Sequence, residues 1–362
     1  MTKRLFGVST AVIVLAAFGA MGVQAQDHPP RPTYKPDGTV IVPSFELPPS
    51  VFQSKESVDI LKLRSMMGGM EGGALPDIAT ARAGVERQLA PFLRMMRERY
   101  PTTVVEQTIG GVPTRIITPR DKPVDRKRVL INLHGGAFSI CADACALLES
   151  MPIAALGGFK VVTVNYRMAP EAQHPAGLED AVAVYRELLK QYKPKQIGVY
   201  GCSAGGALTS QMAAWLPANK MPQPGAIGIF GAGAVRFAYG DSAYLAGYID
   251  GGFAPPPRPG DAPRPAMDRG YFAKADQNDP LLSPAQHPEI IGKFPPTLLI
   301  TGTRAMDLSP AVYTNSMLLK AGVKSTLIVG EGQGHCYIYL PQFPESQDAY
   351  QATVNFFREN LK

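Results

Sequence analysis

The chain has 362 residues, of which 45% are hydrophobic and 18% are charged. This length suits one large domain with an appendage or two smaller domains, and the composition is that of a globular protein with a large core. The 36 basic and 30 acidic residues are scattered, without a basic stripe or interleaved aromatic residues. The sequence therefore predicts no nucleic-acid partner.

The first residues have the pattern of an export signal. Lys3 and Arg4 precede an apolar run from Leu5 to Val23, and Val23 and Ala25 supply small residues for cleavage after Ala25. Residues 1–25 are therefore predicted to be a signal peptide of a periplasmic or secreted protein. The alternative is an uncleaved membrane anchor, because the run is near spanning length. No later segment of the sequence has that character, so cleavage would leave no stable membrane anchor.

Two regions precede the part of the chain with strand patterns. Residues 26–44 are rich in proline and polar residues, which indicates a linker or an extended arm. From about Val51 to Tyr100 the sequence shows helical periodicity, which is interrupted at Gly68–Gly73, and this stretch contains several methionines. These helices could form a lid over an apolar pocket or belong to ordinary helical core.

Residues 101–362 alternate between strand and helix patterns. Such alternation predicts an α/β fold with a mostly parallel central sheet flanked by helices. A proline-rich loop at residues 253–265 interrupts the order; it could border the site, bind a partner or be a tolerated insertion. The predicted strands are Thr103–Ile109, Pro113–Thr118, Val129–Leu133, Lys160–Val164, Ile197–Tyr200, Ile227–Phe230, Thr297–Thr301 and Thr326–Val329, and the predicted helices are Leu178–Leu189, Ala204–Leu216, Pro310–Lys320 and Glu345–Leu361.

Ser203 is the candidate nucleophile. It lies in Gly201-Cys202-Ser203-Ala204-Gly205-Gly206, directly after an apolar strand and before a predicted helix. Glycines on both sides relieve the crowding of a sharp strand-to-helix turn, so that the serine hydroxyl is presented at the end of a buried strand.

A second glycine-rich segment is the candidate oxyanion hole. His134-Gly135-Gly136-Ala137-Phe138 follows the first strong core strand. Backbone N–H groups of Gly135, Gly136 and Ala137, together with that of Ala204, are expected to face the oxygen of a substrate carbonyl. His134 is expected to hydrogen-bond within the loop rather than to transfer protons.

His335 and Asp307 are the candidate base and acid. His335 lies in a glycine-containing loop between the last core strand and the last helix, where it can reach a serine at the same sheet edge. Asp307 is the only carboxylate of the loop after the strand at residues 297–301. It could instead be an acidic residue at a helix N-terminus, where the helix dipole favours negative charge.

The sequence contains four cysteines, which could form disulfide bonds or stay free. Cys141 and Cys145 are close enough in sequence to bond, but i,i+4 spacing within a helix is poor for a disulfide. Cys202 precedes the candidate nucleophile and Cys336 follows the candidate base, so both are expected to line the site, with a regulatory disulfide as the alternative. No spacing of Cys and His indicates a metal site.

These motifs resemble the hormone-sensitive-lipase-like group of α/β-hydrolases, the bacterial family IV esterases, from about Val129 to the C-terminus. The resemblance rests on the His134–Phe138 segment, the Gly201–Gly206 elbow, and Tyr166-Arg167-Met168-Ala169-Pro170-Glu171 followed by His174-Pro175-Ala176 and Glu179-Asp180. It implies that residues 101–362 form an α/β-hydrolase catalytic domain and that residues 45–100 form an N-terminal helical cap. It also implies a serine carboxylesterase that acts on small-molecule esters of short- to medium-chain acyl groups or aromatic esters. It implies no cofactor.

The sequence departs from the family pattern at three positions. Cys202 stands where the family usually has Asp, Ala137 replaces a glycine, and Ala305 stands where relatives that share the Gly-Thr-Arg loop place the catalytic Asp. A shifted loop that lets Asp307 reach His335 would restore the acid. The alternative functions are a non-catalytic ligand-binding protein on the same scaffold and an amidase or acyltransferase that uses the same triad. The sequence does not specify the natural ester or the oligomeric state.

Overall fold

The computed structural model describes residues 31–67, 76–236, 240–250 and 266–362. The predicted signal peptide, the Gly68–Gly73 interruption and the proline-rich loop at 253–265 lie outside the described residues. The chain divides into two units, Met1–Pro48 and Pro49–Lys362. In the first unit, β1 (Thr33–Tyr34) and β2 (Val40–Ile41) pair antiparallel, so the predicted linker contains a short hairpin.

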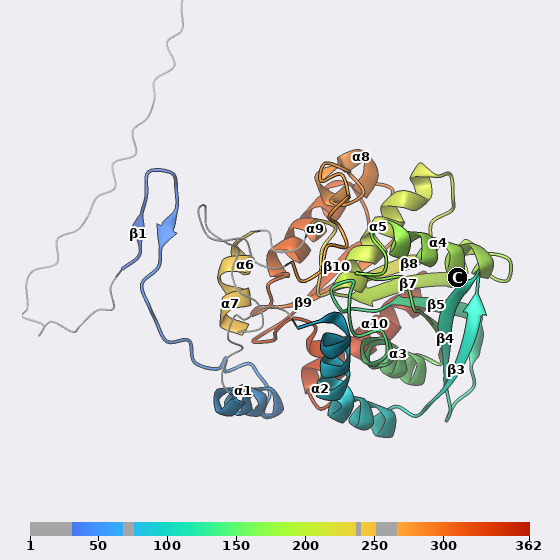
Figure 1. Ribbon diagram of the computed structural model, residues 1–362, viewed down its shortest axis with the longest axis horizontal. Helices are drawn as coiled ribbons and strands as arrows, with labels where there is room; N and C mark the ends of the chain where they lie inside the picture. Colours follow the sequence, from blue (N-terminus) through green and yellow to red (C-terminus); the bar gives the residue numbers. More distant parts are fainter. Residues whose placement is uncertain (1–30, 68–75, 237–239, 251–265) are drawn as a thin grey trace, which may run out of the picture. The chain divides into compact units, whose positions relative to one another are not determined.

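The second unit is built on an eight-stranded sheet in the order β10-β9-β8-β7-β5-β6-β4-β3 (Figure 1). The strands from β10 to β6 are mutually parallel, whereas β4 pairs antiparallel with both β6 and β3. This arrangement confirms the predicted mostly parallel sheet. The strands are β3 (Thr102–Ile109), β4 (Val112–Pro119), β5 (Asp125–Leu133), β6 (Phe159–Val164), β7 (Ile197–Cys202), β8 (Ala226–Phe230), β9 (Thr297–Gly302) and β10 (Ser325–Gly330).

Helices cover both faces of this sheet, and alternate strand residues point to different faces. Val129, Ile131 and Leu133 of β5 join the cluster that includes α4 and α5, whereas Leu130 joins the cluster that includes α3 and α10. Figure 1 shows these two helix pairs on opposite sides of the sheet. The longer helices of this unit are α1 (Lys55–Met67), α2 (Ile78–Arg99), α3 (Ala144–Gly157), α4 (Ala176–Leu188), α5 (Ala204–Ala218), α9 (Leu308–Lys320) and α10 (Pro344–Asn360), and the short ones are α6 (Asp241–Tyr244), α7 (Ala246–Asp250) and α8 (Pro288–Ile291).

Helix α3 was not predicted from the sequence. Nearly every residue from Ala144 to Gly157 is buried, and Pro152 lies within the helix. A helix that is apolar on all sides lacks the polar face that makes a 3.6-residue period visible.

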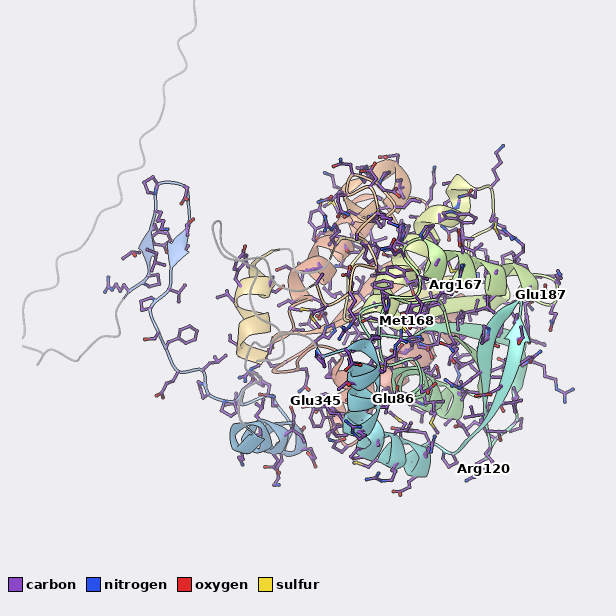
Figure 2. All side chains as sticks on the ribbon, in the orientation of Figure 1. Glu86, Arg120, Arg167, Met168, Glu187 and Glu345 are labelled. Atoms are coloured by element: carbon purple, nitrogen blue, oxygen red, sulfur yellow. A yellow bond between two sulfur atoms is a disulfide. The ribbon has the colours of Figure 1, made fainter. Side chains whose placement is uncertain are left out.

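The N-terminal helices are attached to the rest of the unit by polar contacts. Arg82 of α2 forms an ion pair with Glu171 and donates to the carbonyl oxygens of Ser139 and Ala169. Glu86 of α2 accepts the backbone N–H of Ala144 at the start of α3. Just before α1, Ser54 donates its backbone N–H and its hydroxyl to Glu345 of α10 (Glu86 and Glu345 are labelled in Figure 2). The described part of residues 45–100 is therefore bonded to the loop before α3, to the segment after β6 and to α10.

Within the described residues, no helix is both long enough and apolar enough to cross a bilayer.

Candidate active site

Ser203 lies at the turn between β7 and α5. Its backbone has φ 58° and ψ −120°, a conformation that is costly for a residue with a side chain. The turn is possible because its neighbours lack Cβ atoms: a Cβ on Gly201 or Gly205 would lie 2.1 or 1.7 Å from the carbonyl oxygen of Leu133. The sequence folds here into the strand-turn-helix predicted for a nucleophile elbow.

The structure brings the three candidate catalytic side chains together. The distance between Ser203 Oγ and His335 Nε2 is 3.0 Å, and that between His335 Nδ1 and Asp307 Oδ1 is 2.6 Å. The Asp307 side chain is fully buried and that of His335 is 10% exposed. With the imidazole proton on Nδ1, His335 donates to Asp307 and its Nε2 accepts the Ser203 hydroxyl proton.

Asp307 is oriented by the strand end that precedes it. Thr301 of β9 donates its hydroxyl to Asp307 Oδ2 at 2.6 Å. Asp307 occupies the N-cap position of α9, but its carboxylate makes no capping hydrogen bond and is turned toward His335 instead. Ala305 is completely buried two residues earlier. The loop therefore brings Asp307 to His335, which is the shifted arrangement that the sequence left open.

The predicted oxyanion donors fall into two groups. Gly135 donates its N–H to Glu149 Oε1 at 2.9 Å. The N–H groups of Gly136, Ala137 and Ala204 have no acceptor among the described residues. Unpaired donors of this kind beside a nucleophile are available to a substrate oxygen.

His134 lies beside this loop but does not reach the serine. It is fully buried, its Nδ1 lies 2.6 Å from the carbonyl oxygen of Gly135, and its ring stacks on Tyr166 at 4.3 Å. Burial lowers the pKa of His134 to about 4. The imidazole is thus neutral and packed at neutral pH, in agreement with the structural role expected for it.

All four cysteines are paired. Cys202 is bonded to Cys336, and Cys141 is bonded to Cys145. The first bond joins the residue before Ser203 to the residue after His335, as the alternative interpretation of the sequence allowed. The second forms in spite of the i,i+4 spacing because Cys141 precedes the first turn of α3 and has φ 66°, so the two residues do not share a helix.

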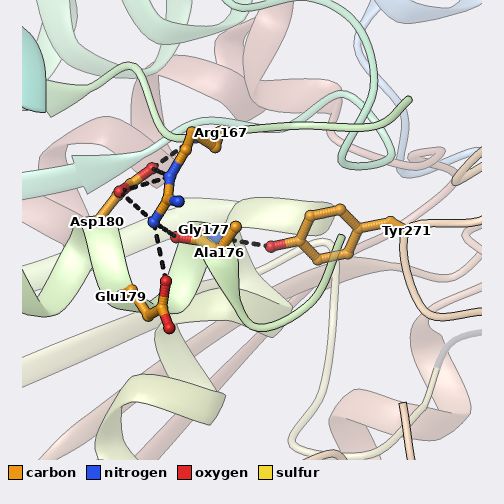
Figure 3. Close-up of polar contacts among 6 residues, drawn as sticks. All are labelled: Arg167, Ala176, Gly177, Glu179, Asp180 and Tyr271. Carbon is orange, nitrogen blue, oxygen red and sulfur yellow. Dashed lines mark hydrogen bonds and ion pairs between the residues drawn. The ribbon is translucent and has the colours of Figure 1, made fainter. Parts of the chain in front are cut away.

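The Tyr-Arg-x-Ala-Pro-Glu segment, residues 166–171, is hydrogen-bonded to side chains of α4. Arg167 donates through Nε to Asp180 and through Nη2 to Glu179 and the carbonyl oxygen of Ala176 (Figure 3). The hydroxyl oxygen of Tyr271 accepts the N–H of Gly177, with a distance of 2.7 Å; Figure 3 marks this bond with a dashed line. These bonds hold the segment between β6 and α4 in place beside the loop His134–Phe138, which contains the candidate oxyanion donors.

One buried carboxylate at the site was missed by the sequence analysis. Glu149 of α3 is 2% exposed, and burial raises its pKa to about 7 although several hydrogen bonds lower it. Its position within an apolar run was the only signal, because buried charged residues are rare without a role.

Comparison with known proteins agrees with this geometry. Residues 130–339 match the model of a family described as having the alpha/beta hydrolase fold, so the chain belongs to that family. The crystal structure of an esterase, E25, superposes with a TM-score of 0.75 and 27% identity, and the match covers 89% of this chain and 99% of that one. The resemblance stated from the motifs and the predicted fold class are confirmed.

Two curated relatives match shorter stretches. A putative acetyl-hydrolase, LipR, of Mycobacterium tuberculosis is 32% identical over 161 residues, which are 43% of this chain and 52% of the relative. An acetyl-hydrolase of Streptomyces hygroscopicus is 30% identical over 237 residues, covering 64% of this chain and 75% of the relative. The chain thus spans about half the length of the first of these proteins.

Proposed function

We propose that this protein is a serine carboxylesterase that hydrolyses small-molecule esters through an acyl-enzyme intermediate. The observation that carries the proposal is the pair of contacts between Ser203, His335 and Asp307, next to N–H groups without an acceptor. The names of the acetyl-hydrolases and the esterase described above support the same reaction class.

In the proposed mechanism, Ser203 Oγ attacks the ester carbonyl carbon while its proton passes to His335 Nε2. Asp307 holds the Nδ1 proton and stabilises the imidazolium. The tetrahedral oxyanion accepts hydrogen bonds from Ala204 and from Gly136 or Ala137. We omit Gly135 from the oxyanion donors because its N–H is bonded to Glu149.

The second half of the reaction uses the same groups. The imidazolium donates its Nε2 proton to the alkoxide oxygen of the leaving alcohol as the C–O bond breaks. Water then attacks the acyl-enzyme, with His335 again taking a proton, and the carboxylic acid leaves as Ser203 recovers its hydroxyl proton. The proposed substrates carry short- to medium-chain acyl groups or aromatic groups.

We further propose that the protein is exported after cleavage following Ala25. The two disulfides support export, because such bonds persist in oxidising compartments and are rare in the cytosol. N-terminal sequencing of protein recovered from the periplasm or medium tests this: a first residue other than Gln26 would contradict it.

Hydrolysis of p-nitrophenyl acetate, butyrate and octanoate by the mature protein tests the catalytic proposal. We expect turnover that falls with the longest chain and is abolished in Ser203→Ala. Absence of turnover on every ester would favour a binding protein. Faster hydrolysis of matched p-nitroanilides than of esters would favour an amidase.

A further inference from the structure

Glu149 is an acidic side chain buried in the apolar helix α3, behind the proposed catalytic groups. It forms no ion pair within the part of the chain that the structure describes. A buried carboxylate without a cation is costly unless hydrogen bonds satisfy its oxygens. The contacts of Glu149 therefore explain why it can be tolerated there.

Each carboxylate oxygen accepts two hydrogen bonds. Oε1 accepts from the N–H of Gly135 at 2.9 Å and from the hydroxyl of Tyr339 at 2.6 Å. Oε2 accepts from the amide of Asn132 at 2.7 Å and from the N–H of Cys202 at 3.2 Å. These bonds use the full acceptor capacity of an ionised carboxylate.

The four donors come from the three segments that carry the proposed machinery. Gly135 lies in the oxyanion loop that follows β5, and Asn132 lies in β5 itself. Cys202 is the last residue of β7 and precedes Ser203. Tyr339 belongs to the turn that follows His335. One carboxylate is thus hydrogen-bonded to the oxyanion loop, the nucleophile elbow and the histidine segment.

The bond to Gly135 has a consequence for the rest of the loop from Gly136 to Phe138. Ala137 and Phe138 have φ values of 51° and 55°, so the loop adopts a conformation that side chains disfavour. An acceptor that fixes the Gly135 peptide also limits how the peptides of Gly136 and Ala137 can turn. Donors held in place before the reaction stabilise an oxyanion without reorganisation.

We propose that Glu149 is a positioning residue that holds the oxyanion loop in register with Ser203 and His335. This inference rests on the proposed esterase function and deepens it. Glu149 touches neither the substrate nor the reacting atoms; it acts through the peptide of Gly135 and the backbone of Cys202.

The substitution Glu149→Gln separates this role from simple packing, because it keeps the shape of the side chain. An amide has one oxygen, so its NH₂ group must face two of the four donors. The side chain of Asn132 can turn its own oxygen toward that NH₂, and the hydroxyl of Tyr339 can rotate, but a backbone N–H cannot change direction. One of the N–H groups, of Gly135 or Cys202, therefore loses its acceptor.

The experiment measures kcat and KM for p-nitrophenyl butyrate, and the inhibition constant of a trifluoromethyl ketone that forms a tetrahedral adduct with serine, all at pH 8. For Glu149→Gln we expect kcat to fall about 10²-fold, as when an oxyanion donor is lost. The inhibition constant should rise in parallel, whereas KM stays within about twofold, because only interactions made in the transition state are weakened. Tyr339→Phe, which removes one donor and keeps the carboxylate, should show a smaller parallel change.

Met151→Ala is the matched control, since Met151 is a buried residue of the same helix outside this network. It should lower the melting temperature and leave kcat and the inhibition constant unchanged. If Glu149→Gln and Tyr339→Phe both keep the wild-type kcat and inhibition constant, or if KM changes in place of kcat, Glu149 has only a structural role. If Glu149→Gln does not fold, Tyr339→Phe decides alone by the same criterion. A wild-type protein that hydrolyses no ester would overturn the proposed function, and this inference with it.

Discussion

Replacing Asp307 with asparagine tests the proposed acid at a position where the side chain changes little in size. Asp307 accepts from His335 and Thr301 through separate oxygens. In Asp307→Asn, an amide NH₂ that faces His335 would donate to Nδ1 and force the imidazole proton onto Nε2. That tautomer presents an N–H to Ser203 and cannot accept its proton.

The loss can be estimated from this tautomer change. In a well-studied serine protease, the equivalent substitution lowers kcat by about 10⁴ while the geometry is kept. At 1.36 kcal/mol for each factor of ten, this corresponds to about 5 kcal/mol of transition-state stabilisation. The complete burial of the Asp307 side chain means that no water replaces the lost acceptor.

The assay is the kcat for p-nitrophenyl butyrate at pH 8, with Thr301→Val as the matched control. The control removes the other hydrogen bond of Asp307 but leaves the tautomer unchanged, so kcat should fall by at most about 10²-fold. If Asp307→Asn retains kcat within about tenfold of the wild type, Asp307 is not the acid and another carboxylate must be sought.

Three further predictions concern stability. The Cys202–Cys336 disulfide joins residues 134 apart in sequence, so the double variant Cys202→Ala/Cys336→Ala should lower the free energy of unfolding by about 5 kcal/mol. The Cys141–Cys145 disulfide joins residues only 4 apart, so Cys141→Ala/Cys145→Ala should lower it by about 2 kcal/mol. Urea denaturation measures both losses, and equal values would refute the dependence on loop length. Gly205→Ala should yield no folded protein, because the new Cβ would lie 1.7 Å from the carbonyl oxygen of Leu133. Gly84→Ala in α2 is the control: its Cβ would meet no atom within 4 Å, and it should stabilise the protein by about 0.5–1 kcal/mol. Circular dichroism and melting temperatures compare the two variants. Burial raises the pKa of Glu149 from 4.5 to about 7, so the folded state favours the protonated side chain. The free energy of unfolding should therefore fall by about 3 kcal/mol as the pH rises from 4.5 to 7. Glu149→Gln should abolish this part of the pH dependence of unfolding, and an unchanged pH profile would contradict the prediction.

Much of the fold could be predicted because its strands are short apolar runs separated by clear turn residues. The eight predicted strands of the central sheet are present, and their ends differ from the prediction by a few residues. The β1–β2 hairpin and the short helices α6 and α7 were not predicted, since a few residues carry no measurable period.

The site was predictable where one local motif determines the geometry. Ser203 could be proposed as the nucleophile because its elbow requires particular glycines, and His335 could be proposed as the base because it lies in the loop after the last strand. Glu149 could not, because α3 has no polar face and its hydrogen bonds come from segments far away in sequence. The contact of Asp307 with His335 depends on how a loop turns, which the sequence left open.

The proposed mechanism requires that Ser203 becomes acylated during turnover. The most direct measurement is peptide mass spectrometry after rapid mixing with p-nitrophenyl butyrate and acid quenching, for the wild type and for Ser203→Ala. We expect one butyryl group on the peptide that contains Ser203, which disappears on longer incubation, and none in Ser203→Ala. Rapid hydrolysis by both proteins, or a butyryl group on another residue, would contradict it.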